Sequence, residues 1–210
     1  MGNKAHYNAV AGHSLGEYTA LAAAKVFSFE DGLTAVVERG KLMAEAKEGT
    51  MYAPIGAKLK DVQNAVDELK HDGIIEVANY NAPGQFIISG EKAMLDKAGE
   101  LLKERGARKI IPLPVGGAFH SPLMDNAGRE IGKVLDKIEF RIPQSAFYAN
   151  VTGNRIDNPQ EIKENLVLQL THPVRWIDII ENIIKDGSEN FIEVGPGKVL
   201  RGLVKRIDKS

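Results

Sequence analysis

One short pattern in the sequence is typical of a nucleophilic serine. Residues 12–16 read Gly-His-Ser-Leu-Gly, which matches the G-x-S-x-G nucleophile elbow, a sharp strand-to-helix turn that exposes the serine hydroxyl. Apolar residues precede the turn and follow it at helical spacing, so the context favours a nucleophile at Ser14 over a serine that only caps a helix. The turn also aims the Leu15 amide, at the positive end of the helix, toward a developing oxyanion.

A serine nucleophile needs a base, and His120 is the best-placed histidine. It lies in the loop 116–122, between two predicted subdomains, where a side chain can project into the cleft between them. The alternative interpretation is a loop histidine beside the helix that follows. Of the other histidines outside the elbow, His71 ends a predicted helix, His172 precedes a proline and is more typical of a structural role, and His6 lies near the start of the sequence.

A third residue that could take part in the chemistry is Arg39, on the second predicted helix. An arginine on a helix is usually a solvated surface charge. Its planar guanidinium is also the side chain best suited to a bidentate hold on a carboxylate. If Arg39 faces the cleft, the substrate therefore carries a free acid.

The composition argues against several classes of protein. Lysine and arginine total 27 against 28 aspartates and glutamates. The chain therefore lacks the large net positive charge that attracts nucleic acid or an anionic membrane. Without cysteine there is no disulfide, thiolate nucleophile or cysteine-ligated metal. The start lacks an apolar core of signal-peptide length, and no apolar run approaches the roughly 18 residues of a membrane span. We therefore expect a cytoplasmic protein with neither nucleic-acid nor membrane partners.

Strands and helices alternate at both ends of the chain, which predicts an α/β subdomain with a parallel sheet. A strand runs into the elbow, and two helices follow it, the second over residues 29–46. The later part predicts a helix over 122–137, a strand over 145–149, helices over 159–170 and 173–185, a strand over 190–194 and a closing helix from residue 198.

Shorter elements interrupt this alternation between residues 51 and 115. Their order is strand, helix, strand, strand, helix, strand, at 51–57, 60–71, 74–79, 85–89, 91–105 and 109–115, which is typical of the ferredoxin-like arrangement. The predicted fold is a hydrolase-like α/β domain, residues 1–50 and 116–210, with an inserted ferredoxin-like subdomain at 51–115. Glycines at 49, 116 and 117 are suitable hinges between the two.

Six motifs along the chain together resemble the malonyl-CoA:acyl carrier protein transacylase family, which is related to the acyltransferase domains of fatty acid and polyketide synthases. They are GHSLGEY at 12–18, ERG at 38–40, NYNAPGQ at 79–85, GAFHS at 117–121, NVTG at 150–153 and EVGPG at 193–197. The resemblance covers essentially the whole chain. It implies transfer of a malonyl group from malonyl-CoA to the phosphopantetheine thiol of acyl carrier protein, in fatty acid biosynthesis, with no cofactor and no metal.

The resemblance also implies roles for individual residues. Ser14 would form the acyl-enzyme ester, with the Leu15 amide at the oxyanion, and His120 would act first as general base and then as general acid. Arg39 would hold the malonyl carboxylate. The backbone carbonyl of Gln169 would orient His120 in place of the acid of a usual triad. Two further substrate-binding residues are implied: Asn81, and Phe119, whose ring would crowd an α-methyl branch and so favour malonyl over methylmalonyl groups.

The sequence departs from the family at one point. Members carry a segment before the elbow with a Gly-Gln-Gly motif that supplies a second oxyanion amide, whereas this sequence reaches the elbow at residue 12 and contains no such motif. Loss of one oxyanion donor costs about a hundredfold to a thousandfold in rate in other enzymes. We therefore expect an N-terminally incomplete α/β subdomain, weak activity of the chain alone and self-association through the incomplete sheet.

Two other functions remain open at this stage. A serine hydrolase or thioesterase would share the elbow, although it normally places an acid between serine and histidine and the histidine near the end of the chain. A non-catalytic relative that only binds acyl carrier protein is the other alternative. Basic residues at helical spacing on the closing helix could dock an acidic carrier: Lys198, Arg201, Lys205 and Arg206.

Overall fold

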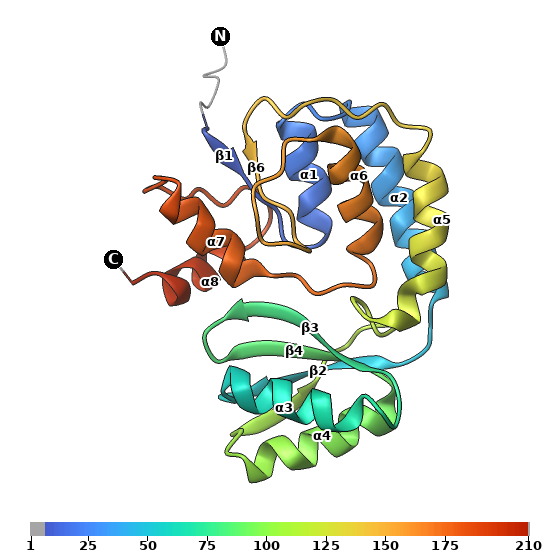
Figure 1. Cartoon of the computed structure of the whole chain (residues 1–210), viewed down its shortest axis with the longest axis vertical. Coiled ribbons are helices and arrows are strands. Elements are labelled where there is room, and N and C mark those ends of the chain that lie inside the picture. The colour runs from blue at the N-terminus through green and yellow to red at the C-terminus, as the bar shows by residue number, and fades with distance from the viewer. Residues whose placement is uncertain (1–6, 210) are drawn as a thin grey trace.

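Two sheets organise the chain in the computed structural model, which describes residues 7–209 (Figure 1). The smaller sheet is a parallel pair of two-residue strands, β1 (Ala9–Val10) and β6 (Ala146–Phe147). The larger has four antiparallel strands in the order β3-β4-β2-β5. The predicted α/β fold with a parallel sheet and a separate antiparallel unit is confirmed. His6 lies outside the described residues.

The antiparallel unit occupies the lower half of Figure 1. Its elements are β2 (Thr50–Ile55), α3 (Leu59–Leu69), β3 (Ile75–Ala82), β4 (Gln85–Gly90), α4 (Lys92–Glu104) and β5 (Lys109–Pro112). This strand order and the two covering helices are those of a ferredoxin-like unit. α3 buries Val62, Ala65, Val66 and Leu69, the i, i+3, i+4, i+7 spacing of an amphipathic helix. The division at residues 51 and 115 stays a prediction.

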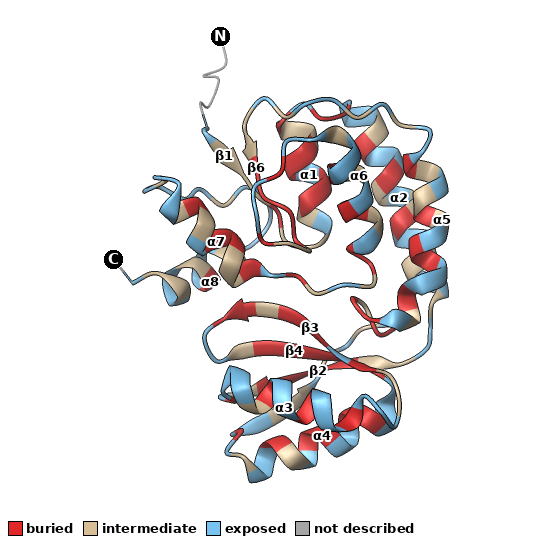
Figure 2. Ribbon diagram, viewed as in Figure 1, coloured by how far each residue is buried: buried red, intermediate tan, exposed pale blue. Residues whose placement is uncertain are grey.

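Helices form most of the other unit. They are α1 (Leu15–Ala23), α2 (Phe29–Glu45), the short 3-10 helix η1 (Pro122–Met124), α5 (Asp125–Leu135), α6 (Pro159–Leu168), α7 (Trp176–Lys185) and α8 (Val199–Ile207). Buried residues of α1, α2, α5 and α6 share one core, and Figure 2 shows their buried faces turned toward one another. Side-chain caps begin two of these helices: Ser28 at α2 and Asn158 at α6 each accept backbone N–H groups.

The two units are joined along the edge of β3. Val174 exchanges two backbone hydrogen bonds with this edge: its N–H donates to Ala78 (2.9 Å), and its carbonyl accepts from Tyr80 (2.9 Å). α7 and α8 pack beside the same strand. The sheet therefore presents one edge to the segment that links α6 to α7, which places residues from both units around the end of α1.

The predicted strand over 190–194 is wrong. These residues form no strand in the structure, and the side chains of Ile192 and Val194 are 85% and 88% exposed. Aromatic and β-branched residues such as those of this segment favour an extended backbone, but a strand also needs a neighbour to satisfy its N–H and C=O groups. Within residues 7–209 no such neighbour lies beside this segment.

Several predicted boundaries also shift. The strand predicted over 145–149 is reduced to the two residues of β6, and β5 ends at Pro112 instead of 115. The helix predicted from 173 begins at Trp176, after residues that follow the edge of β3. The helix predicted over 122–137 begins with η1 and ends at Leu135. None of the helices in the described part of the chain is long and apolar enough to cross a membrane.

Candidate active site

Ser14 lies on the sharp turn between β1 and α1. Its backbone has φ 49° and ψ −105°, a conformation that L-residues rarely adopt and that nucleophile elbows impose. Gly12 permits the turn, because a Cβ at that position would lie 1.9 Å from the Gly16 carbonyl oxygen. The sequence therefore folds here into the strand, turn and helix that its G-x-S-x-G pattern predicts.

His120 faces Ser14 and is held from its other side. Its Nε2 lies 3.0 Å from Ser14 Oγ, and its Nδ1 lies 2.7 Å from the Gln169 carbonyl oxygen. A carbonyl can only accept, so Nδ1 carries the proton and Nε2 is free to accept one from the serine hydroxyl. Burial lowers the pKa of His120 to about 4, and the nearby Arg39 adds to this effect, against the hydrogen bond to Gln169. The imidazole is therefore a neutral base at pH 7.

Arg39 is buried at the same point, with only 4% of its surface exposed. Its Nη2 donates to Ser14 Oγ at 2.8 Å and to Gln169 Oε1 at 3.2 Å. The guanidinium lies over the Tyr18 ring, 5.8 Å from its centroid, and its Nε has no hydrogen-bond partner among residues 7–209. Burial lowers the pKa of Arg39, but a guanidinium stays protonated at neutral pH. Arg39 therefore brings a buried positive charge to the serine, through its Nη2.

The two backbone amides of the turn have different surroundings. The Ser14 N–H donates to Asn150 Oδ1 at 2.7 Å. The Leu15 N–H, the first of α1, enters no hydrogen bond in the described part of the chain, as expected at a helix N-terminus. One amide is thus occupied and the next is open to an anion beside Ser14.

Asn81 and Phe119 lie at the border of the two units, where the sequence predicts substrate contacts. Asn81, near the end of β3, has its Oδ1 2.7 Å from His13 Nε2, and the His13 ring packs against Trp176 with centroids 5.5 Å apart. Phe119 is half-buried and packs against the buried residues of both units. Asn81 therefore contacts the elbow through His13 and not through Ser14.

The structure separates the remaining histidines from the serine. His71 lies on an exposed turn after α3. His172 is exposed, and its Nδ1 lies 3.0 Å from the Leu168 carbonyl oxygen and 2.9 Å from Thr171 Oγ1. Of the histidines in the described part, only His120 is within hydrogen-bond distance of Ser14.

Two residues of the site escaped the sequence argument. Glu17 is buried beneath the turn with 1% of its surface exposed, and Asn150 is fully buried. Both fall inside the quoted motifs, at 12–18 and 150–153, but an acid in the first turn of a helix is usually explained by the helix dipole. Only their burial and their contacts with distant residues mark them as part of the site.

Comparisons with known proteins identify the family of the chain. Residues 1–209 match the acyl transferase domain family. The malonyl CoA-acyl carrier protein transacylase of Bacillus subtilis (strain 168) is 42% identical over 203 residues, which cover 95% of this chain and 64% of that protein. The corresponding protein of Staphylococcus aureus (strain COL) is 42% identical over 202 residues, 94% of this chain and 66% of its own length.

Solved structures give the same result. An acyl carrier protein S-malonyltransferase from Vibrio cholerae superimposes with a TM-score of 0.95 at 41% identity, covering 98% of this chain and 68% of the other. A malonyl-transacylase in complex with a type II polyketide synthase acyl-carrier protein matches with a TM-score of 0.94 at 39% identity, over 99% of this chain and 68% of the other. The chain thus spans about two thirds of the length of these relatives, and over that span it belongs to the acyl transferase domain family.

Proposed function

We propose that the chain carries the acyl-accepting serine of an S-malonyltransferase, which moves a malonyl group from malonyl-CoA to the thiol of an acyl carrier protein in lipid metabolism. The observation that carries this proposal is the position of Ser14 Oγ, 3.0 Å from a neutral imidazole and 2.8 Å from a buried guanidinium. The names of the relatives support the donor and the acceptor.

In the first half-reaction Ser14 Oγ attacks the thioester carbonyl carbon and passes its proton to His120 Nε2. The carbonyl oxygen becomes an oxyanion, for which the open Leu15 amide and the end of α1 are suited. The carbon–sulfur bond then breaks, and His120 returns the proton to the CoA sulfur. In the second half-reaction the carrier thiol gives its proton to His120 and attacks the ester carbonyl, and the proton goes back to Ser14 Oγ as the thioester forms.

Arg39 gives the site its selectivity in this proposal. Its charge and its planar guanidinium, which already reaches Ser14 Oγ through Nη2, suit the free carboxylate of a malonyl group. Phe119 would limit branching at the α-carbon, and Asn81 would line the acyl site beside His13. The chemistry as written needs only a nucleophile and a base, so we propose neither metal nor cofactor, and we propose the cytoplasm as the location.

The partner helix in this proposal is α8. Lys198 at its N-cap and Arg201 and Lys205 along it are exposed, whereas Arg206 is tied to the β3–β4 hairpin through a 2.6 Å bond from its Nη1 to Gln85 Oε1. Three solvent-facing cations on one short helix suit an acidic carrier. This surface would also serve the alternative function, binding of the carrier without transfer.

A hydrolase or thioesterase is less well supported by the contacts of His120. An acid normally holds the histidine in such enzymes, and here a backbone carbonyl does so. Release of CoA from malonyl-CoA with water as the sole acceptor would nevertheless support hydrolysis.

The direct test is the intact mass of the protein after mixing with malonyl-CoA. Addition of one malonyl group, lost in Ser14→Ala and kept in the control Ser188→Ala, is the expected result. An adduct that persists in Ser14→Ala would overturn the nucleophile assignment. Carrier binding without any adduct would instead select the non-catalytic alternative.

A further inference from the structure

The reaction proposed above leaves one buried acid without a role. Glu17 lies in the first turn of α1, three residues after the nucleophile, and faces the interior. A carboxylate is rarely buried unless its oxygens are hydrogen-bonded, because its desolvation is costly. Burial raises the pKa of Glu17 to about 7, and the hydrogen bonds from Asn150 and Gln169 and the charge of Arg39 oppose that rise. Burial of the Glu17 carboxyl group therefore costs free energy, which its hydrogen bonds and the charge of Arg39 must offset.

Both oxygens of Glu17 accept hydrogen bonds from groups that can only donate. Its Oε1 accepts from the backbone N–H of Asn150 at 2.9 Å, and its Oε2 accepts from Gln169 Nε2. The orientation of the Gln169 amide is fixed, because Arg39 donates to its Oε1. Each of the two donors is therefore matched by its own carboxyl oxygen of Glu17.

Gln169 connects Glu17 to the base. The same side-chain nitrogen also donates to the Ser14 carbonyl oxygen at 3.0 Å, while the Gln169 backbone carbonyl accepts from His120 Nδ1 at 2.7 Å. His120 has a positive φ of 58°, which costs energy unless its surroundings hold it. Glu17 thus restrains the residue that orients the imidazole.

Asn150 connects Glu17 to the nucleophile. Its side chain accepts from the Ser14 N–H at 2.7 Å and donates to the Gly12 carbonyl oxygen at 2.7 Å, so it spans the strained turn. The other side of Asn150 is held as well, since its carbonyl accepts from the Arg175 N–H at 2.9 Å.

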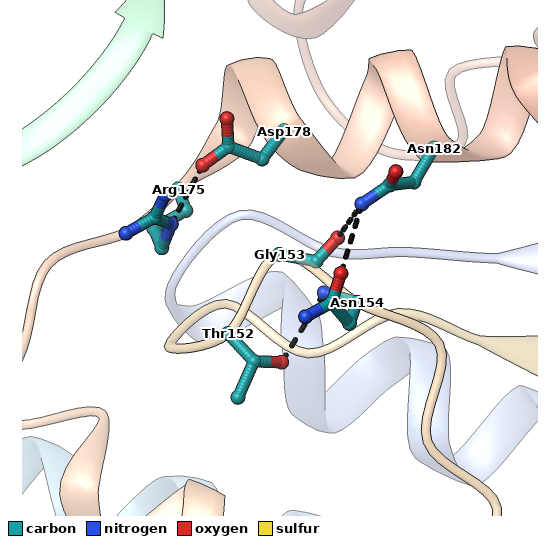
Figure 3. Close-up of polar contacts among 6 residues, drawn as sticks. All are labelled: Thr152, Gly153, Asn154, Arg175, Asp178 and Asn182. Atoms are coloured by element: carbon teal, nitrogen blue, oxygen red, sulfur yellow. Dashed lines mark hydrogen bonds and ion pairs between the residues drawn. The ribbon is translucent and has the colours of Figure 1, made fainter.

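The loop that begins at Asn150 is anchored along α7. Figure 3 shows the Asn182 side chain donating to the Gly153 carbonyl oxygen and to Asn154, beside the ion pair of Arg175 and Asp178. Asn150 is therefore fixed from the side of α7 as well as by Glu17.

We propose that Glu17 is a positioning residue that keeps Ser14 and His120 in reactive register through Asn150 and Gln169. Ser14 and His120, whose backbones are both strained, lie 106 residues apart in sequence. The Glu17 carboxylate is hydrogen-bonded to Asn150, which holds Ser14, and to Gln169, which holds His120. The catalytic role of Glu17 rests on the proposed function, whereas the restraint of Asn150 and Gln169 by Glu17 is a property of the fold. Glu17 touches none of the reacting atoms.

The test compares Glu17→Gln with Glu164→Gln, an isosteric change at an exposed position on α6. A carboxamide has one acceptor, so either Asn150 or Gln169 would face an N–H group in Glu17→Gln. The first readout is the second-order rate at which an alkyl fluorophosphonate modifies Ser14, followed by intact mass. In this reaction the Oγ–phosphorus bond forms, fluoride leaves and His120 takes the proton, so neither malonyl-CoA nor carrier protein is needed.

The second readout is the low-field proton resonance of His120 Nδ1–H, which does not depend on reactivity. In Glu17→Gln we expect the phosphonylation rate to fall about 10- to 100-fold, the effect of a displacement near 1 Å, and the resonance to weaken or vanish. Glu164→Gln should match the unmodified protein in both. Rates are measured well below each melting temperature, because a purely structural Glu17 would lower that temperature without changing the reactivity of the folded protein.

The outcomes separate the two proposals. An unchanged rate and an unchanged resonance in folded Glu17→Gln would overturn the positioning role. If the unmodified protein is not labelled at Ser14, the proposed function fails. Loss of the resonance in Glu17→Gln would still support the restraint of His120 in that case.

Discussion

Replacement of Arg39 by alanine separates its contact with a substrate carboxylate from its contacts within the site. In the free protein, Arg39 holds Ser14 Oγ and Gln169 Oε1, and its Nε has no partner among residues 7–209. A malonyl carboxylate would gain a charge-assisted hydrogen bond from the Arg39 guanidinium, worth about 1.5 to 3 kcal/mol. An acetyl group has no carboxylate and would lose only what Arg39 gives to Ser14.

The assay is single-turnover acylation of Ser14 by malonyl-CoA and, in parallel, by acetyl-CoA. In Arg39→Ala we expect the ratio of malonyl to acetyl rates to fall about 10- to 150-fold, the factor that corresponds to this energy. Arg39→Lys keeps the charge without the planar fork and should give an intermediate ratio. Arg129→Ala, at an exposed position on α5, is the control and should leave the ratio unchanged.

An equal loss for both donors would refute the reasoning. It would mean that Arg39 acts on Ser14 and Gln169 alone, and that the carboxylate is bound elsewhere. The melting temperature must be measured alongside, because Arg39→Ala also removes the positive charge near the buried Glu17. A ratio measured on folded protein is insensitive to such a loss of stability, since both donors meet the same folded population.

Two further predictions concern pH and association. Because burial lowers the pKa of His120 to about 4, the rate of Ser14 acylation should rise as pH increases through about 4 and be level from pH 5 to 8; a midpoint near the ordinary histidine value of about 6.5 would contradict the buried geometry. The exposed side chains of Ile192 and Val194 should promote self-association, so Ile192→Lys with Val194→Lys should shift the protein toward monomer in light scattering, and an unchanged distribution would assign association to another surface.

The sequence was sufficient to locate the groups nearest the serine, because each sits in a recognisable local context. The turn around Ser14 needs only a strand, glycines and a helix, all readable within a few residues. His120 was identified by its type and its loop between the predicted subdomains, and Arg39 by the chemistry of its guanidinium on the second predicted helix. The structure brings both within hydrogen-bond distance of Ser14. Gln169 came from the family resemblance alone, since no local pattern singles out a backbone carbonyl.

What escaped prediction depends on contacts between distant segments. Glu17 is indistinguishable in sequence from an acid that complements a helix dipole, and its burial is set by residues 150 and 169. The segment 190–194 contains Phe, Ile and Val, residues common in strands, but strand formation requires a neighbouring backbone that local sequence cannot supply. Both errors follow from the same limit: local pattern predicts conformation, whereas burial and pairing are decided by the rest of the fold.

The two buried ionisable groups of the site, His120 and Glu17, make the free energy of unfolding depend on pH in opposite directions. His120 has a lowered pKa, so it contributes stability above about pH 6.5 that is lost as pH falls toward 4. Glu17 has a raised pKa, so its contribution is largest below about 4.5 and declines as pH rises toward 7. Between these values the two contributions oppose each other, and global stability is a poor measure of either group. The reactivity of Ser14 follows His120 directly, because a protonated imidazole cannot accept the serine proton. Glu17 influences that reactivity only through Asn150 and Gln169, which is why a rate and a single imidazole resonance report on the site where a melting curve does not.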